Sequence, residues 1–346
     1  MKPVREQISS ATPKVSVALI TYNHGRFIVQ AIESVLMQET DFPVELVIGE
    51  DCSTDATREI VKDYAVRYPS VIRALLPERN LGAHENAKTT LGSCRGEYVA
   101  YLDGDDYWTD SKKLQAQVDF LDAHPGSALC FHDALVQYED NSSALHRFLP
   151  PELRCDRTTE SLLNRYMIFT GAMVYRAKCV PDYSQWPSGL ELSDWALTLM
   201  CSVHGTISYI DKVMGVYRRH EGGTWGGIAQ ERRYRKQIQM LQDFNRYFSY
   251  RYDDICRKAM VDRIIPLMEC YATDGKFANA VRYALMSLRL DPMGRHASWS
   301  KLGRLVFRAC IPALHRGLSA RLPWSIRLYR SIKSRCANRT TLAGGR

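Results

Sequence analysis

The stretch Tyr98-Val-Ala-Tyr-Leu-Asp-Gly-Asp-Asp-Tyr-Trp108 predicts a buried strand that ends in a cluster of carboxylates. Its first five residues have apolar and aromatic side chains, which are typical of a short buried strand. Asp103, Asp105 and Asp106 follow at once, and Gly104 allows the tight bend that brings neighbouring carboxylates together. Because these carboxylates repel one another and are costly to desolvate, a divalent cation such as Mn²⁺ or Mg²⁺ would stabilise them. Taken alone, the stretch also fits an acidic turn on a solvated loop.

The residues around this stretch alternate between strand and helix patterns. Strands are expected at 15–20, 44–48, 71–75, 128–131, 169–175, 207–210 and 214–217, and helices at 27–37, 56–68, 85–94, 112–124 and 196–203. Ser53 or Thr54 is expected to cap the helix that begins at 56. The order strand, helix, strand predicts an α/β fold with a mostly parallel sheet and helices on both faces.

Polar loops follow three of the expected strands, at Thr21–His24, Glu50–Asp55 and Asp103–Asp106. Ligands of such sheets bind at the carboxyl ends of the strands. The first strand is not followed by Gly-x-Gly-x-x-Gly, and the chain has no Gly-x-x-x-x-Gly-Lys-Ser/Thr. These two observations argue against a dinucleotide oxidoreductase and a P-loop enzyme.

Composition narrows the class of protein further. A chain of 346 residues is long enough for one large domain and a smaller one. Its ten cysteines include no Cys-x-x-Cys pair, which argues against a zinc site and fits reduced thiols in the cytoplasm. No apolar run is long enough to span a bilayer, and the N-terminus lacks the apolar core of a secretory signal.

The net charge of +8 is unevenly distributed along the chain. From Pro292 onward there are 12 Lys and Arg and no Asp or Glu, so residues 1–291 carry 34 basic and 38 acidic side chains, a net charge of −4. Basic residues in 293–346 alternate with aliphatic and aromatic ones, as in segments that bind anionic membrane surfaces. An oligomer contact, a nucleic-acid patch or a disordered basic tail are the alternatives, although the confined charge makes a nucleic-acid partner unexpected.

Several segments, taken in order, resemble the family 2 glycosyltransferases of the GT-A fold. The matching segments are Thr21-Tyr22-Asn23, Glu50-Asp51-Cys-Ser-Thr-Asp55, Asn80-x-Gly82, Gly96-x-Tyr98, Asp103-Gly-Asp-Asp-Tyr-Trp108, Ser193-Asp194-Trp195 and Tyr217-Arg218-x-His220. They span roughly residues 13–226, about two thirds of the chain.

The resemblance implies a metal-dependent, inverting bacterial enzyme. Such an enzyme would move a sugar from a nucleotide-diphospho-sugar, with a UDP-sugar expected, to a hydroxyl of a glycan or lipid-linked acceptor in surface polysaccharide or glycoconjugate synthesis. It would work in the cytoplasm or on the cytoplasmic face of the inner membrane. The alternative is a catalytically silent GT-A module that binds a sugar nucleotide or glycan.

The resemblance also implies roles for individual residues. The donor would be bound by Thr21, Tyr22, Asn23, Asp51, Asp103 and Arg218. Asp105 and His220 would bind Mn²⁺ or Mg²⁺, with Asp106 in reserve. From the residues alone, Asp51 would serve in a turn, and His220 and Arg218 would be solvated surface residues.

Asp194 matches the family's catalytic base, and Glu191 is the reserve candidate. Inverting transfer needs a carboxylate that accepts the proton of the attacking hydroxyl. Without the resemblance, Asp194 would be interpreted as the N-cap of the helix that follows it.

These observations divide the chain into four parts. Residues 1–13 are a lead-in, and 14–227 are the glycosyltransferase domain, with a nucleotide-sugar half (14–136) and an acceptor half (137–227). Residues 228–292 form a helical appendage, whose hairpin around Asp274-Gly-Lys276 resembles one tetratricopeptide-type helix pair. Residues 293–346 are the basic amphipathic tail.

Overall fold

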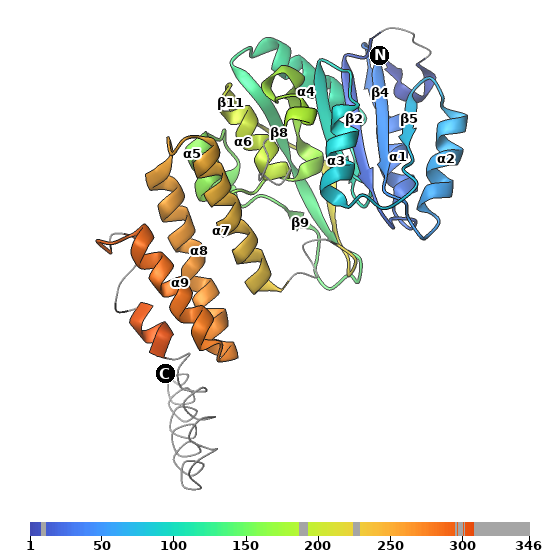
Figure 1. The fold of residues 1–346 in the computed structure, drawn as a ribbon. Coiled ribbons are helices and arrows are strands. Elements are labelled where there is room, and N and C mark those ends of the chain that lie inside the picture. The colour runs from blue at the N-terminus through green and yellow to red at the C-terminus, as the bar shows by residue number, and fades with distance from the viewer. Residues whose placement is uncertain are drawn as a thin grey trace, which may run out of the picture. The chain divides into compact units, whose positions relative to one another are not determined.

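The computed structural model describes residues 1–7, 12–186, 193–223, 229–294, 296, 300 and 302–307. The chain divides into two compact units, Met1–Gly227 and Ile228–Arg346 (Figure 1). The first unit is an α/β domain, and the helices described in the second unit are all α-helices.

The N-terminal half of the sheet is parallel. It contains β5 (Ile72–Leu75), β4 (Val44–Glu50), β2 (Val15–Thr21) and β6 (Tyr98–Asp103), in that order. Strands β2 and β4 are buried almost throughout, as expected of central parallel strands with near-continuous apolar runs. The helices of this half are α1 (Ile28–Leu36), α2 (Thr57–Arg67), α3 (Ala83–Gly92) and α4 (Lys113–Ala123).

The other half makes the sheet mixed. The order continues from β6 through β10 (Val174–Arg176), β8 (Ser127–Tyr138) and β11 (Thr206–Arg219) to β7 (Tyr107–Trp108). Strand β10 is antiparallel to both neighbours, β8 and β11 are parallel, and β7 is antiparallel to β11. The short β9 (His146–Arg147) pairs with β8, and β1 (Lys2–Pro3) pairs with β3 (Glu39–Thr40). Helices α5 (Thr159–Asn164) and α6 (Asp194–Ser202) complete the unit, and the α/β class is confirmed.

Three expected strands in this half differ in the structure. The strands expected at 207–210 and 214–217 are one strand, β11, whose pairing with β8 shifts register between Ile210 and Val213 and again before Val216. Such bulges interrupt the alternation of side chains without ending a strand, which explains why the pattern suggested two. The strand expected at 169–175 begins instead with a 3-10 turn, Thr170–Ala172, and only Val174–Arg176 pair in the sheet.

The cap of α2 is also different from the expectation. Neither Ser53 nor Thr54 caps the helix; the Asp55 carboxylate accepts hydrogen bonds from the backbone N–H of Thr57 (2.9 Å) and its hydroxyl (2.5 Å). Ser53 and Thr54 instead contact Asn23, at the end of β2.

The second unit contains a helical hairpin. The unit contains α7 (Gln230–Tyr247), α8 (Asp253–Asp274) and α9 (Phe277–Leu290), and α8 and α9 form the hairpin. Gly275 ends α8 with a left-handed conformation, φ 65°, which glycine adopts without steric cost. Within the described part of the chain, none of the helices is both long and apolar enough to cross a membrane. Most of the basic tail, from 308 on, lies outside the described residues, so the prediction about it stays a prediction.

Candidate functional site

Three polar loops meet at the carboxyl ends of adjacent strands. Strand β2 lies between β4 and β6, with Thr21 paired with Glu50 and Ile20 paired with Asp103. The three loops that the sequence singled out therefore begin at the same edge of the sheet. This edge is where open α/β sheets bind their ligands.

Hydrogen bonds connect the loop after β2 with the loop after β4. The Asn23 side-chain oxygen accepts from the Thr54 N–H at 2.8 Å, and the Asn23 N–H donates to the Ser53 hydroxyl at 2.9 Å. Asn23 and Cys52 both have φ 56°, a conformation that is uncommon outside glycine and is often found at functional sites. Tyr22, next to this contact, is 42% exposed, so its ring is open to a ligand.

Asp51 holds the turn around Asn80. Its two carboxylate oxygens accept from the N–H groups of Leu81 (2.6 Å) and Gly82 (2.9 Å), and its carbonyl accepts from the Asn80 side chain (3.0 Å). A carboxylate has about four acceptor positions, so Asp51 can still accept from a further donor.

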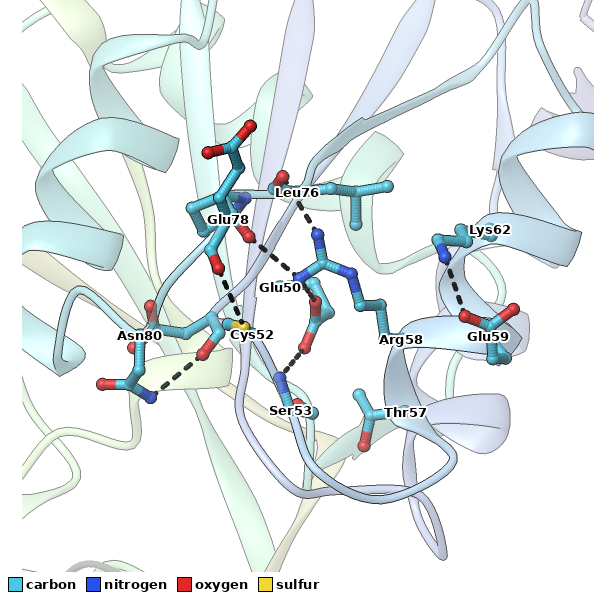
Figure 2. Close-up of polar contacts among 12 residues, drawn as sticks. Glu50, Cys52, Ser53, Thr57, Arg58, Glu59, Lys62, Leu76, Glu78 and Asn80 are labelled. Carbon is cyan, nitrogen blue, oxygen red and sulfur yellow. Dashed lines mark hydrogen bonds and ion pairs between the residues drawn. The ribbon is translucent and has the colours of Figure 1, made fainter.

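A second carboxylate beneath this loop is neutralised within the protein. Glu50 is fully buried, and its side chain forms an ion pair with Arg58 at 3.1 Å and accepts from the Ser53 N–H. Figure 2 shows the Arg58 guanidinium between Glu50 and the Leu76 carbonyl, to which it also donates. A buried charge needs such a partner, so Glu50 and Arg58 stabilise the loop.

The acidic loop after β6 approaches β2 closely at Gly104. A Cβ at this position would lie 2.5 Å from the Thr21 hydroxyl oxygen and 3.0 Å from His24 Nδ1. Only glycine fits there without displacing these side chains. The Thr21 hydroxyl and His24 Nδ1 are themselves 3.2 Å apart.

Asp105 lies between two imidazoles. Its Oδ2 is 3.0 Å from His220 Nε2 and 3.7 Å from His24 Nε2, and the three side chains are between 3% and 18% exposed. Burial would raise the pKa of Asp105, but the His220 hydrogen bond and the charges of both imidazoles lower it below its usual value. Burial lowers the pKa of His24, against the attraction of Asp105. The structure thus joins the two predicted metal ligands, Asp105 and His220, and adds His24.

Arg218 and Asp106 connect the acidic loop to β11. The Arg218 N–H donates to the Asp106 carboxylate at 2.7 Å, and its guanidinium donates to the Asp105 carbonyl at 2.6 Å. The guanidinium also lies over the rings of Tyr107 (4.4 Å) and Phe27 (5.0 Å). Burial raises the pKa of Asp106 well above its usual value, as do the charges of the two other aspartates. Because the Asp106 carboxylate already accepts a hydrogen bond from the backbone of β11, Asp105 is the better placed of the two to bind a metal ion.

The carboxyl groups of Asp103 and Asp194 interact electrostatically. Burial raises the pKa of Asp103 well above its usual value, and the charges of Asp105 and Asp194 raise it further. Burial also raises the pKa of Asp194 to about 6, against the hydrogen bond from the Trp195 N–H (2.7 Å). Asp194 is the first residue of α6, and Ser193, which accepts from the Ala196 N–H at 3.2 Å, is the N-cap. The interpretation of Asp194 as the cap itself is therefore wrong, and its reserve, Glu191, lies outside the described residues.

The donor types at Asp105 and His220 fit a divalent cation. Among the described residues, no group of three or more His, Cys, Asp or Glu is arranged to hold a metal ion. His220 Nδ1 is buried and has no hydrogen-bond partner within the described chain, so Nε2 is the nitrogen directed at Asp105. Mn²⁺ accepts carboxylate oxygen and imidazole nitrogen, and Mg²⁺ is commonly bound by one or two carboxylates with substrate phosphates.

Sequence reasoning did not single out His24 or Thr170. His24 belonged to a polar strand-end loop, which was the only signal for it. Thr170 was placed inside an expected strand, yet its hydroxyl lies 3.5 Å from Asp194 Oδ2. Neither contact is visible in a local sequence pattern.

Comparisons with known proteins agree with this geometry. The model of the family described as glycosyl transferase family 2 matches residues 16–179. An uncharacterized protein of Mycobacterium tuberculosis is 42% identical over 219 residues, which cover 63% of this chain and 62% of that protein. The chain thus spans less than two thirds of the length of this relative.

Two named transferases are more distantly similar. The poly(ribitol-phosphate) β-N-acetylglucosaminyltransferase TarS of Staphylococcus aureus is 29% identical over 175 residues, covering 49% of this chain and 28% of TarS. The structure of TarS 1–349 with UDP-GlcNAc has a TM-score of 0.50 at 20% identity, covering 74% and 81% of the two chains. The mannosyltransferase PcManGT of Pyrobaculum calidifontis, solved with GDP-Man and Mn²⁺, has a TM-score of 0.52 at 17% identity, covering 90% and 89%.

The structural likenesses show a shared fold, and the family match agrees with the motifs from Thr21 to Trp108. Residues 16–179 of this chain are similar to glycosyl transferase family 2.

Proposed function

We propose that the chain transfers a glycosyl group from a nucleotide-diphospho-sugar, a UDP-sugar in the first instance, to a hydroxyl of a glycan or lipid-linked acceptor. The role is in the synthesis of a surface polysaccharide or glycoconjugate, and the anomeric configuration is inverted. The observations that carry the proposal are the three polar loops that meet at the carboxyl ends of β2, β4 and β6, and the Asp194 carboxyl group, whose charge acts on Asp103. The family match and the sugar nucleotides bound by TarS and PcManGT support it.

The donor would bind along the carboxyl ends of β2, β4 and β6. The exposed Tyr22 ring can stack on the base, and Asp51 has acceptor positions left for a ring N–H. Thr21 and Asn23 shape this end of the site, Asp103 would contact the ribose, and Arg218 would lie near the diphosphate. Asp105 and His220 would hold Mn²⁺ or Mg²⁺, and the cation would neutralise the charge on the leaving diphosphate.

Asp194 would act as the general base. As the acceptor hydroxyl oxygen bonds to the anomeric carbon, its proton moves to the Asp194 carboxylate, and the bond from that carbon to the diphosphate breaks. A group with a pKa of about 6 is well matched to this step, because it is ionised at pH 7 and still basic. We expect kcat to fall as pH drops through about 6, since protonated Asp194 cannot accept the proton.

Two variants test this role. Asp194→Asn keeps the size of the side chain but removes its basicity, so we expect kcat to fall about 10²-fold or more while donor affinity is retained. Asp182→Asn is a control, because Asp182 caps the turn Tyr183–Gln185 and lies outside the proposed machinery. Equal losses of donor affinity and kcat in Asp194→Asn would point to a structural role.

A catalytically silent binding module is the alternative function. It would bind a sugar nucleotide without product formation at any pH. A thermal-shift panel of sugar nucleotides with and without Mn²⁺ would identify the donor through ligand-linked stabilisation. Chromatography of the reaction with a glycan acceptor would then separate the enzyme from the silent module.

The basic residues of 293–346 lead to a proposal about location. Attached to the cytoplasmic face of the inner membrane through them, the enzyme would meet a lipid-linked acceptor there. An oligomer contact is the competing role for this segment.

A further inference from the structure

Thr170 begins a tightly held turn next to the Asp194 carboxyl group. Hydrogen bonds from both sides fix the 3-10 turn Thr170–Ala172: the Trp108 indole N–H donates to the Gly171 carbonyl at 2.7 Å, and the Gln117 side chain donates to the Ala172 carbonyl at 2.9 Å. A Cβ at Gly171 would lie 2.6 Å from the Phe169 ring. The turn therefore has little freedom to move.

The Thr170 hydroxyl faces the Asp194 carboxyl group. It donates to Asp194 Oδ2 at 3.5 Å, the outer limit of a hydrogen bond. Asp194 Oδ1 already accepts from the Trp195 N–H at 2.7 Å, so Oδ2 is the oxygen that the Thr170 hydroxyl can orient.

We propose that Thr170 is a positioning residue, whose hydroxyl directs Asp194 Oδ2 toward the acceptor. This inference rests on the proposed function of Asp194. The carbonyl groups of Gly171 and Ala172 accept hydrogen bonds from Trp108 and Gln117. The turn that orients Asp194 is therefore fixed to the segment that follows the acidic loop. A fixed base is important for rate, since small misplacements of reacting groups cost large factors.

Two variants separate this role from a structural one. Thr170→Val keeps the β-branched shape and loses the hydroxyl, whereas Thr170→Ser keeps the hydroxyl. We expect Thr170→Val to lower kcat about tenfold with donor affinity unchanged, and Thr170→Ser to stay within about threefold of the wild type. Similar melting temperatures of the two variants would show that the fold is retained.

A direct titration of Asp194 keeps the test independent of turnover. In full-length protein labelled with ¹³C-aspartate, the carboxyl signal of Asp194 is assigned through its absence in Asp194→Asn. The groups facing it are Asp103, Tyr101, Tyr166 and the Trp195 N–H. Loss of a hydrogen bond to the charged form should raise the midpoint in Thr170→Val by about half a pH unit, and Thr170→Ser should match the wild type.

The outcomes distinguish this proposal from the proposed function. If the wild type transfers no sugar from any donor, the proposed function fails, and an Asp194 midpoint that rises only in Thr170→Val still supports the contact. If the wild type is active and Asp194→Asn is not, but Thr170→Val has the wild-type kcat and midpoint, the positioning role is overturned. A loss shared equally by Thr170→Val and Thr170→Ser would also overturn it, because the hydroxyl would then be irrelevant.

Discussion

Lys113 is a buried cation whose removal should stabilise the protein. It lies in α4 and is fully buried, and its Nζ has no hydrogen-bond partner among the described residues. Its Nζ lies 3.9 Å from the centroid of the Trp108 ring, a favourable cation–π contact. Burial lowers the pKa of Lys113 from 10.5 to about 7. The perturbation is Lys113→Met, an apolar side chain of similar length.

The pKa shift sets the size of the effect. The lowering of the Lys113 pKa from 10.5 to about 7 corresponds to about 5 kcal/mol when the amine is protonated in both states, and to about 4 kcal/mol at pH 7. The attraction between a desolvated ammonium and an indole ring offsets about 2 kcal/mol of this penalty. A net gain of about 2 kcal/mol in the free energy of unfolding is therefore expected at pH 7, or about 4–8 °C for a unit of this size.

The sign of the pH dependence follows from the lowered pKa. Between pH 7 and 10.5 the unfolded chain holds the Lys113 proton and the folded chain does not, so wild-type stability increases with pH in this window. The advantage of Lys113→Met should be greatest at or below pH 7 and should disappear near pH 10.5.

Thermal unfolding followed by calorimetry at pH 6, 7, 8.5 and 10 tests this expectation. Lys112→Met is the matched control, because Lys112 is adjacent and exposed and the change in net charge is the same. A Lys113→Met protein that is no more stable than the wild type at pH 7 would refute the argument. An advantage that is the same at pH 7 and pH 10 would refute it too, since burial of the charge would not be its cause.

Three other predictions follow from the described contacts and the tail. Asp105→Asn should weaken Mn²⁺ binding to the nucleotide complex at least tenfold, because an amide lacks the charge of a carboxylate; unchanged binding by electron paramagnetic resonance would remove Asp105 from the metal site. Asp55→Ala removes hydrogen bonds to Thr57 and Gly25 and should lower the free energy of unfolding by about 1–2 kcal/mol. Burial by itself would raise the pKa of Asp55, but these hydrogen bonds outweigh burial, and the pKa is lowered overall. The difference in stability between wild type and Asp55→Ala, measured by urea denaturation, should therefore be present at pH 7 and shrink as pH falls below about 4. A difference that does not change with pH would contradict this. Truncation after Pro292 should release the chain from anionic vesicles, at about 1 kcal/mol for each Lys or Arg near the surface, and full-length protein that ignores such vesicles at low salt would contradict the membrane role.

The local pattern of the sequence was sufficient to predict the strands in the first half of the domain and the polar loops that follow them. The strands at β2, β4 and β6 are buried apolar runs, and the loops that follow them contain the polar residues of the site. Parallel strands joined by helices bring their carboxyl ends to one edge, so Thr21, Glu50 and Asp103 could be expected together from sequence order alone. The family resemblance, several of whose motifs lie at these strand ends, agrees with the family model that matches residues 16–179.

The partners of these side chains were decided by the tertiary structure. Arg58 neutralises Glu50, His24 approaches Asp105, and Thr170 contacts Asp194. These three pairs are 8, 81 and 24 residues apart in the sequence. The Thr170 contact depends on a 3-10 turn before β10, and Arg218 lies in β11 beyond that strand's register shifts. Neither feature leaves a periodic signal in the sequence. The pKa values of the site residues could not be predicted from the sequence either, because burial and neighbouring charges exist only once the chain has folded.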